Sequence, residues 1–326
     1  MHFVLGIDTS CYQTSCAAVD LKGQLLADSR RILKVPKQQR GLRQSEAVFQ
    51  HLKQLPDVLQ DVFDQIGEGN LAAVCASSQP VNRPDSYMPV FVTGSSYARS
   101  IAASHHVPIF FTSHQEGHFA AAQIGVRALP ETHLAIHLSG GTTELIFVNP
   151  AGYRLLGGTL DISAGQLLDR IGVEMGYDFP AGPSLEALAT AAAARSRYPA
   201  IVKGMNLSLS GVEAAARRDL AQAVLPKEEI AAELFDAIVR GLSKLMVAAA
   251  EQTKVYDVLL TGGVASSRLL RELLDERLRK RAGRTSTFYG LPQFAGDNAA
   301  GVALIGLKYL LKEKEHGHRI ERKRTV

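Results

Sequence analysis

Two histidines four residues apart, His114 and His118, are the residues whose type and spacing could most directly do chemistry. If Ser113 caps a helix that starts here, both imidazoles lie on one face of that helix and can bind the same metal ion. Many pairs with this spacing are only surface or capping histidines, so the motif alone does not establish a site. Gln115 follows His114 where the HExxH motif of zinc proteases has glutamate, which argues against a metallopeptidase.

A third metal ligand must come from another segment, and Asp297, in residues 296–301 (GDNAAG), is our candidate. The alternative is that Asp297 only caps a helix. Asp8, directly after the first predicted strand, is our candidate catalytic residue, and Asp169 lies on a predicted helix. Either carboxylate could hold a metal-bound water or a ribose hydroxyl, or could simply cap a helix or pair with a cation.

Two glycine-rich turns offer backbone N–H groups to an anion. Residues 139–143 (SGGTT) lie between two predicted strands, and residues 261–264 (TGGV) lie between a strand and a helix. Glycines there let the backbone approach a phosphate closely. Either turn alone could be a tight connection, but two turns at strand ends of a repeated fold favour a phosphate site.

Basic residues gather in two places, and such clusters can grip an RNA backbone. A solvated helix end and a solvated tail are the explanation that we favour. The clusters are Arg277, Arg279, Lys280, Arg281 and Arg284, and Arg319, Arg322, Lys323 and Arg324.

The elements that must position these residues repeat along the chain. Residues 3–28 and 134–156 each predict a strand, a turn, a strand, a tight turn and a strand, and the tight turns at Gly23 and Gly152 are 129 residues apart. Helical periodicity alternates with short apolar strands elsewhere, which predicts two related α/β halves with mixed sheets. We expect helices over 45–66, 95–104, 113–126, 162–176 and 227–253, and further strands over 72–76, 107–111 and 258–261.

The composition is that of a chain that buries a core. Of 326 residues, 46% are hydrophobic and 21% charged, which excludes wholesale disorder, and the net charge of +4 permits an RNA or phosphate partner without demanding one. Three cysteines form no disulfide framework and no CxxC metal pair. The start of the chain lacks the pattern of a signal peptide, and no apolar run is long enough for a membrane helix, so we expect a cytoplasmic protein without a membrane partner.

The order of these segments resembles the tRNA threonylcarbamoyladenosine transferase family, formerly called the glycoprotease or O-sialoglycoprotein endopeptidase family, over nearly the whole chain. Residues 6–11 (GIDTSC) resemble its opening strand and turn, residues 114–118 (HQEGH) its metal helix, and residues 139–141 (SGG) its first phosphate loop. Residues 160–170 (LDISAGQLLDR) are similar to its adenosine-binding helix. Four further segments keep the family order: PAGP (180–183), SLSG (208–211), GGV (262–264) and DN (297–298).

The resemblance implies a fold. It is an α/β fold with actin-like ATPase architecture, in which two ribonuclease-H-like subdomains are related by internal duplication. Residues 1–130 would form the first subdomain, with 297–316 returning to it, and residues 131–296 would form the second. Apart from the resemblance, the charged segment from Lys312 to Val326 predicts a frayed end, of which residues 317–326 are the basic tail.

The resemblance also implies an activity. The family transfers a threonylcarbamoyl group from its mixed anhydride with AMP to the exocyclic amine of the adenosine beside the anticodon of tRNA. One divalent metal ion, iron or zinc, would be bound by His114, His118 and Asp297, and would orient and polarise the carbamoyl-phosphate end. The implied partners are threonylcarbamoyl-AMP or another adenine nucleotide, and tRNA. The implied substrate-binding residues are Leu138, Ser139, Gly140, Gly141, Thr142, Asp169, Gly182, Gly263 and Ser267.

The chain departs from the family pattern. Tyr12 and Gln13 occupy positions where the family has two acidic residues, Thr142 stands where histidine is usual, and Ser267 stands where an adenosine-contacting asparagine is expected. Residues 77–84 replace a Gly-Pro-Gly loop. The chain thus resembles a divergent member of the family, and we expect its adenylate pocket to keep the phosphate end and to be weakened at the base end.

Two hypotheses follow from these departures. The first is an active metal-dependent transferase. The second is a non-catalytic actin-like paralogue that binds nucleotide and metal and pairs with another family member as a heterodimer.

Overall fold

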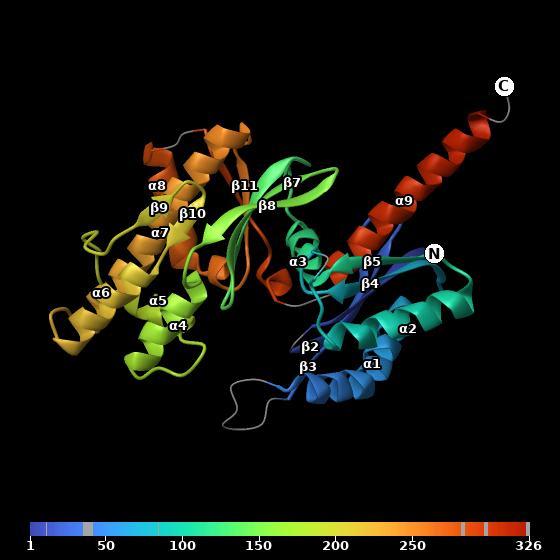
Figure 1. The fold of residues 1–326 in the computed structure, drawn as a ribbon, viewed down its shortest axis with the longest axis horizontal. Coiled ribbons are helices and arrows are strands. Elements are labelled where there is room, and N and C mark those ends of the chain that lie inside the picture. Colours follow the sequence, from blue (N-terminus) through green and yellow to red (C-terminus); the bar gives the residue numbers. More distant parts are fainter. Residues whose placement is uncertain (11, 35–41, 84, 282–283, 297–298, 324–326) are drawn as a thin grey trace. The chain divides into compact units, whose positions relative to one another are not determined.

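Figure 1 shows the fold in a computed structural model that describes residues 1–326 except residues 11, 35–41, 84, 282–283, 297–298 and 324–326. The chain divides into two units. Unit 1 comprises Met1–Ile124 and Gly296–Val326, and unit 2 comprises Gly125–Ala295. Each unit is built around its own mixed β-sheet.

Unit 1 contains a five-stranded sheet in the order β3-β2-β1-β4-β5. β1 pairs antiparallel with β2, and β2 pairs antiparallel with β3, whereas β1, β4 and β5 run parallel. The strands are β1 (His2–Thr9), β2 (Gln13–Asp20), β3 (Leu25–Ile32), β4 (Asn70–Gln79) and β5 (Ile109–Ser113).

The side-chain alternation of β1 decides which helices cover each face of this sheet. Phe3, Leu5 and Ile7 pack against α1 (Gln44–Ile66) and α2 (Val90–His105), which lie together in Figure 1. Val4 faces the other way and packs against α9 (Ala300–Lys323). A short helix, α3 (His114–Ala122), follows β5 and packs against α9.

Unit 2 contains a seven-stranded sheet in the order β12-β11-β6-β7-β8-β10-β9. Its core surrounds α7, whose apolar side chains are buried along most of the helix. The strands are β6 (His133–Leu138), β7 (Thr143–Asn149), β8 (Gly152–Thr159), β9 (Ile201–Lys203), β10 (Asn206–Ser208), β11 (Asp257–Thr261) and β12 (Ser286–Tyr289). The helices are α4 (Ala164–Glu174), α5 (Gly182–Ala189), α6 (Ser210–Ala221), α7 (Lys227–Thr253) and α8 (Arg268–Arg281).

The two sheets share one topology, which confirms the predicted internal duplication. β6, β7 and β8 pair antiparallel in sequence, as β1, β2 and β3 do. β11 then joins β6 in parallel and β12 joins β11, as β4 and β5 follow β1. The repeated units therefore lie in two separate sheets with the same strand order, and unit 2 adds only the β9–β10 hairpin at one edge.

Some boundaries differ from the predicted ones. β3 does not end at Asp28 but continues to Ile32, because its pairing with β2 extends to the contact between Gln13 and Ile32. The segment from Lys312, which we expected to be frayed, belongs to helix α9 as far as Lys323.

Within the described part of the chain, no helix combines the length and apolar character needed to cross a bilayer.

Candidate functional site

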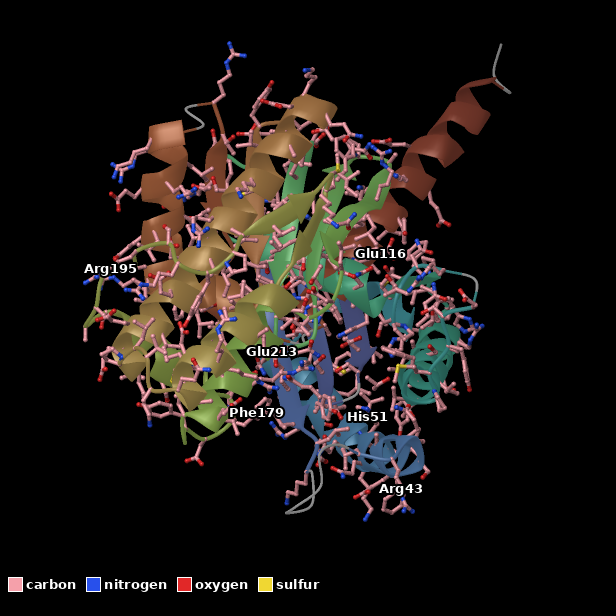
Figure 2. The ribbon with its side chains drawn as sticks, turned by 60° about the vertical axis from the view of Figure 1, so that its left-hand side comes forward. Arg43, His51, Glu116, Phe179, Arg195 and Glu213 are labelled. Atoms are coloured by element: carbon pink, nitrogen blue, oxygen red, sulfur yellow. The ribbon has the colours of Figure 1, made fainter. Side chains whose placement is uncertain are left out.

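The helix of the paired histidines begins where the sequence predicts. The Ser113 hydroxyl accepts the backbone N–H of Glu116 at 3.2 Å, and the Glu116 carboxylate accepts the backbone N–H of Ser113 at 3.0 Å. This reciprocal capping box satisfies two N–H groups and fixes His114 as the first residue of α3. Glu116, labelled in Figure 2, also accepts hydrogen bonds from the Thr112 and Ser113 hydroxyls and from the Asn82 amide. Its carboxylate therefore stabilises the junction between β5 and α3.

The imidazoles of His114 and His118 meet edge to face. Their Nε2 atoms are 3.0 Å apart, and the ring centroids are 4.4 Å apart. Two nitrogens bound to one zinc or similar ion at about 2.1 Å, with bond angles between a right angle and the tetrahedral angle, would be about 3.0–3.4 Å apart. The described pair therefore fits two ligands of one metal ion.

The carboxylate of Asp8 contacts the His114 ring at Nδ1, the nitrogen that does not face His118. Both of its carboxylate oxygens contact His114 Nδ1, at 3.0 and 3.1 Å, and the side chain has no exposed surface. The Ser77 hydroxyl donates to the same carboxylate. A carboxylate on the far nitrogen of a metal-binding histidine orients the ring and makes it a stronger ligand. In this geometry Asp8 fixes the orientation of the His114 ring, a contact that sequence spacing did not indicate.

The third ligand expected from the sequence, Asp297, lies outside the described residues. Among the described residues, no group of three or more His, Cys, Asp and Glu side chains is arranged to hold a metal ion. The helix after this segment, α9, packs closely on α3, because a Cβ on Gly301 would lie 1.8 Å from the carbonyl oxygen of Gly117. Glycine at position 301 thus permits the two helix backbones to touch.

Unit 2 contains a cavity of about 580 Å³. Five of the substrate-binding residues implied by the resemblance line it, namely Gly140, Asp169, Gly182, Gly263 and Ser267. The remaining lining residues are Gly165, Leu168, Phe179, Pro180, Pro183, Glu186, Phe235, Val264 and Ser266. Phe179, labelled in Figure 2, is 75% exposed and leaves an aromatic ring available to a ligand.

The other four predicted residues lie in or under the turn before β7 and do not line the cavity. Leu138 is fully buried at the end of β6. The Ser139 hydroxyl accepts the backbone N–H groups of Gly141 and Thr142 at 3.3 and 3.0 Å, which tightens the turn. Gly140 stays open, because a Cβ built there would meet nothing within 4 Å.

Three polar side chains fix the wall of the cavity. Asp169 Oδ1 accepts the backbone N–H of Ala181 at 2.8 Å, which ties α4 to the start of α5. At the start of α8, Glu186 Oε1 accepts the N–H of Leu269 at 2.9 Å, and Ser267 Oγ accepts the N–H of Leu270 at 3.1 Å. Sequence reasoning missed Glu186, and its only signal was a carboxylate four residues after Gly182 on the same helix.

The SLSG segment has a structural partner in Asp161. Burial raises the pKa of Asp161, but this effect is outweighed by the Leu209 N–H, the Ser210 and Ser208 hydroxyls and the Ile162 N–H, which hold the pKa well below its usual range. These donors lie 2.6–2.8 Å from the carboxylate. The ionised Asp161 carboxylate therefore links the starts of α4 and α6 through its hydrogen bonds.

A family model described as tRNA N6-adenosine threonylcarbamoyltransferase matches residues 25–304. A protein of that name from Anaeromyxobacter sp. is 31% identical over 96% of this chain and 96% of its own length. A "probable bifunctional tRNA threonylcarbamoyladenosine biosynthesis protein" from Methanothermobacter thermautotrophicus is 31% identical over 93% of this chain, which spans 55% of that relative.

Solved structures with low sequence identity show the fold alone. Component A of (R)-2-hydroxyglutaryl-CoA dehydratase from Acidaminococcus fermentans is 17% identical, with a TM-score of 0.56 over 95% of this chain and 100% of its own. A ROK family protein from Streptococcus pneumoniae is 13% identical, with a TM-score of 0.56 over 96% of this chain and 99% of its own. These likenesses show the actin-like ATPase fold that the sequence predicts.

Proposed function

The chain belongs to the tRNA N6-adenosine threonylcarbamoyltransferase family, and on that premise we propose that it transfers a threonylcarbamoyl group from threonylcarbamoyl-AMP to the exocyclic amine of the adenosine beside the anticodon of tRNA. The observation that supports this most strongly is the cavity of unit 2, which gathers, from four separate segments, five residues that the family resemblance assigns to the adenylate. Its volume is in the range typical of small-molecule sites.

The proposed reaction is an acyl transfer. The exocyclic nitrogen of the adenosine forms a bond to the carbamoyl carbon, and the bond from that carbon to the phosphate oxygen breaks. Its electron pair leaves with AMP, and the nitrogen gives up one proton. Transition-state stabilisation must therefore act on the phosphate oxygens that gain charge.

The residues of the cavity fit the three parts of the adenylate. Open backbone at Gly140 and Gly263 can approach the phosphate closely. The carboxylates of Asp169 and Glu186, each held by one backbone N–H, can accept hydrogen bonds from ribose hydroxyls. The exposed ring of Phe179 can stack on the base.

We propose that His114 and His118 hold one divalent ion, iron or zinc, with Asp297 as the third ligand. When bound, such an ion would polarise the carbamoyl-phosphate group as a Lewis acid. The contribution of Asp8 is to hold His114 in the orientation that directs Nε2 toward Nε2 of His118.

The second candidate function is the non-catalytic paralogue. It is favoured by Tyr12 and Gln13, which replace two acidic residues of the family. Tyr12 is half exposed and Gln13 begins β2 with its backbone paired to Ile32, and neither side chain has a carboxylate. Such a protein would bind nucleotide and metal without transfer, and would act in a heterodimer with another family member.

A transfer assay separates the two candidates. Zinc- or iron-loaded protein is incubated with threonylcarbamoyl-AMP and tRNA lacking the modification, alone and with a catalytically active family member, and the digested nucleosides are measured by mass spectrometry. We expect threonylcarbamoyladenosine with the protein alone, and a strong loss in Asp169→Asn. Glu276→Gln, a change at an exposed residue of the same unit, is the matched control and should retain activity. Binding of the adenylate without transfer would support the paralogue, and no binding would contradict both candidates.

A further inference from the structure

A buried histidine that the proposed function does not use lies under the turn before β7. His137 is 7% exposed, and its Nδ1 lies 3.2 Å from the Thr142 hydroxyl oxygen. That oxygen is in turn 2.9 Å from the hydroxyl oxygen of Ser139. Three side chains therefore form a continuous hydrogen-bonded path from the interior of unit 2 to the turn that carries Gly140 and Gly141.

The His137 ring is packed between the two glycine-rich turns. It is the penultimate residue of β6, and its register partners are Glu144 on β7 and Thr261 on β11. A Cβ on Gly262 would lie 2.8 Å from Cδ2 of His137 and 2.3 Å from the carbonyl oxygen of Leu138, and the φ of Gly262 is +99°. Only glycine tolerates both this conformation and this approach, so the second turn can rest directly on the imidazole.

The hydrogen bonds of the Ser139 and Thr142 hydroxyls determine which of the two donates to the other. Ser139 Oγ accepts the N–H groups of Gly141 and Thr142, which occupies both of its lone pairs. Its own proton must then be donated, and the hydroxyl of Thr142 is in range to accept it. The Thr142 proton consequently has two possible destinations, His137 Nδ1 or a group outside the turn.

Whether His137 Nδ1 carries a hydrogen determines which of these two acceptors receives the Thr142 proton. If Nδ1 has no hydrogen, it accepts the Thr142 proton and the turn offers no hydroxyl donor to a ligand. If Nδ1 carries a hydrogen, it donates to Thr142 Oγ1, whose lone pairs are then both used. The Thr142 proton must in that case point away from His137, to a group outside the turn.

We propose that His137 carries a hydrogen on Nδ1 and is thereby a positioning residue of the phosphate turn, which makes the Thr142 hydroxyl a hydrogen-bond donor to the phosphate of a bound adenylate. The inference rests on the proposed function only in placing the phosphate at this turn. His137 acts through Thr142, and its effect is confined to ligands that carry a phosphate. Adenosine, which lacks one, does not sense it.

The test compares AMP with adenosine as ligands in calorimetric titrations of the full chain. A hydrogen bond to a charged phosphate is worth about tenfold or more in affinity. We therefore expect His137→Leu to weaken AMP binding by about tenfold and to leave adenosine binding within about twofold of wild type. His137→Asn, which retains a side-chain N–H close to the position of Nδ1, should restore most of the AMP affinity.

A double-mutant cycle tests whether the effect passes through Thr142. Thr142→Val removes the hydroxyl at nearly constant shape and should weaken AMP binding by the same factor. In the Thr142→Val background, His137→Leu should have no further effect. Because Thr142 is in a surface turn, this arm stays informative even if His137→Leu destabilises the fold.

Several outcomes would overturn the inference. They are additive losses in the cycle, equal losses of AMP and adenosine affinity in His137→Leu, and a wild-type protein that prefers AMP to adenosine no more than His137→Leu does. These outcomes differ from failure of the proposed function. A protein that shows the predicted AMP-specific loss but transfers nothing to tRNA would support the role of His137 and contradict the transferase.

Discussion

Ser267 Oγ accepts the backbone N–H of Leu270 at 3.1 Å, so the residue expected at the base end of the adenylate pocket also caps the helix α8. The same residue lines the cavity of unit 2. A substitution there changes helix stability and ligand binding together, unless the new side chain can also cap. Asparagine is as good a cap as serine and offers both a donor and an acceptor to a base.

Ser267→Asn should therefore improve ligand binding at little cost in stability. We expect AMP affinity to rise by about tenfold, because one or two hydrogen bonds of about 0.5–1.5 kcal/mol each are gained. Calorimetric titration of AMP measures this, and urea unfolding checks that stability stays within about 0.5 kcal/mol. Ser267→Ala is the control that loses the cap, with about 1 kcal/mol of stability. Unchanged AMP affinity in Ser267→Asn would show that Ser267 does not limit the pocket.

Two substitutions of Asp169 should separate its contribution to stability from the contribution of its charge to ligand binding. Asp169→Ala leaves the N–H of Ala181 without its acceptor and should lower the free energy of unfolding by about 1–3 kcal/mol. Asp169→Asn keeps an oxygen for that N–H, so its stability should remain near wild type while its adenosine affinity falls. Thermal or urea unfolding, paired with adenosine titration, measures both. Equal stability of the two variants would argue that the bond between α4 and the start of α5 is not important.

Asp8→Asn should weaken metal binding through His114. Loss of the carboxylate behind a ligating imidazole typically lowers metal affinity by about 10–100-fold. Competition for zinc with a chromogenic chelator measures this. Asp20→Asn, in an exposed turn of the same unit where the side-chain oxygen accepts two backbone N–H groups, is the matched control. Zinc affinity that is the same in Asp8→Asn and Asp20→Asn would contradict the positioning role of Asp8.

His133 should make unit 2 less stable in mild acid. Burial lowers the pKa of His133, and its Nδ1 contacts the carbonyl oxygen of Pro130 at 2.7 Å. As the pH falls through about 6.5, the unfolded chain takes up a proton that the folded chain binds only at lower pH, so the free energy of unfolding decreases.

His133→Asn is the variant that isolates this effect, because its amide can donate to Pro130 but does not titrate. The difference in free energy of unfolding between pH 7 and pH 5 should be smaller in His133→Asn than in wild type. Urea unfolding at the two pH values measures it. A difference of the same size in both proteins would show that His133 does not contribute to acid sensitivity.

Local patterns predicted the parts of the structure that local chemistry determines. The two hairpin units were predictable because turns and strands recur in the same order, and the capping box at Ser113 was predictable because serine and glutamate are three residues apart. The convergence of His114 and His118 followed from helical spacing alone.

The rest depends on contacts between distant segments. Asp8 and His114 are 106 residues apart, and Glu186 and Leu269 are 83 apart, so no local pattern indicates either pair. The hydrogen-bonded path through His137 was missed for a different reason, because a histidine within an apolar strand has no distinguishing spacing. Its role is visible only once the turn brings Thr142 and Ser139 together.

The ratio of AMP released to adenosine modified tests the central claim most directly. In a single turnover with excess protein over threonylcarbamoyl-AMP, the proposed acyl transfer predicts one AMP for each threonylcarbamoyladenosine formed in tRNA, and no AMP release above background when tRNA is omitted. AMP release that is independent of tRNA, with no modified nucleoside, would contradict the account, because the chain would then only hydrolyse the adenylate.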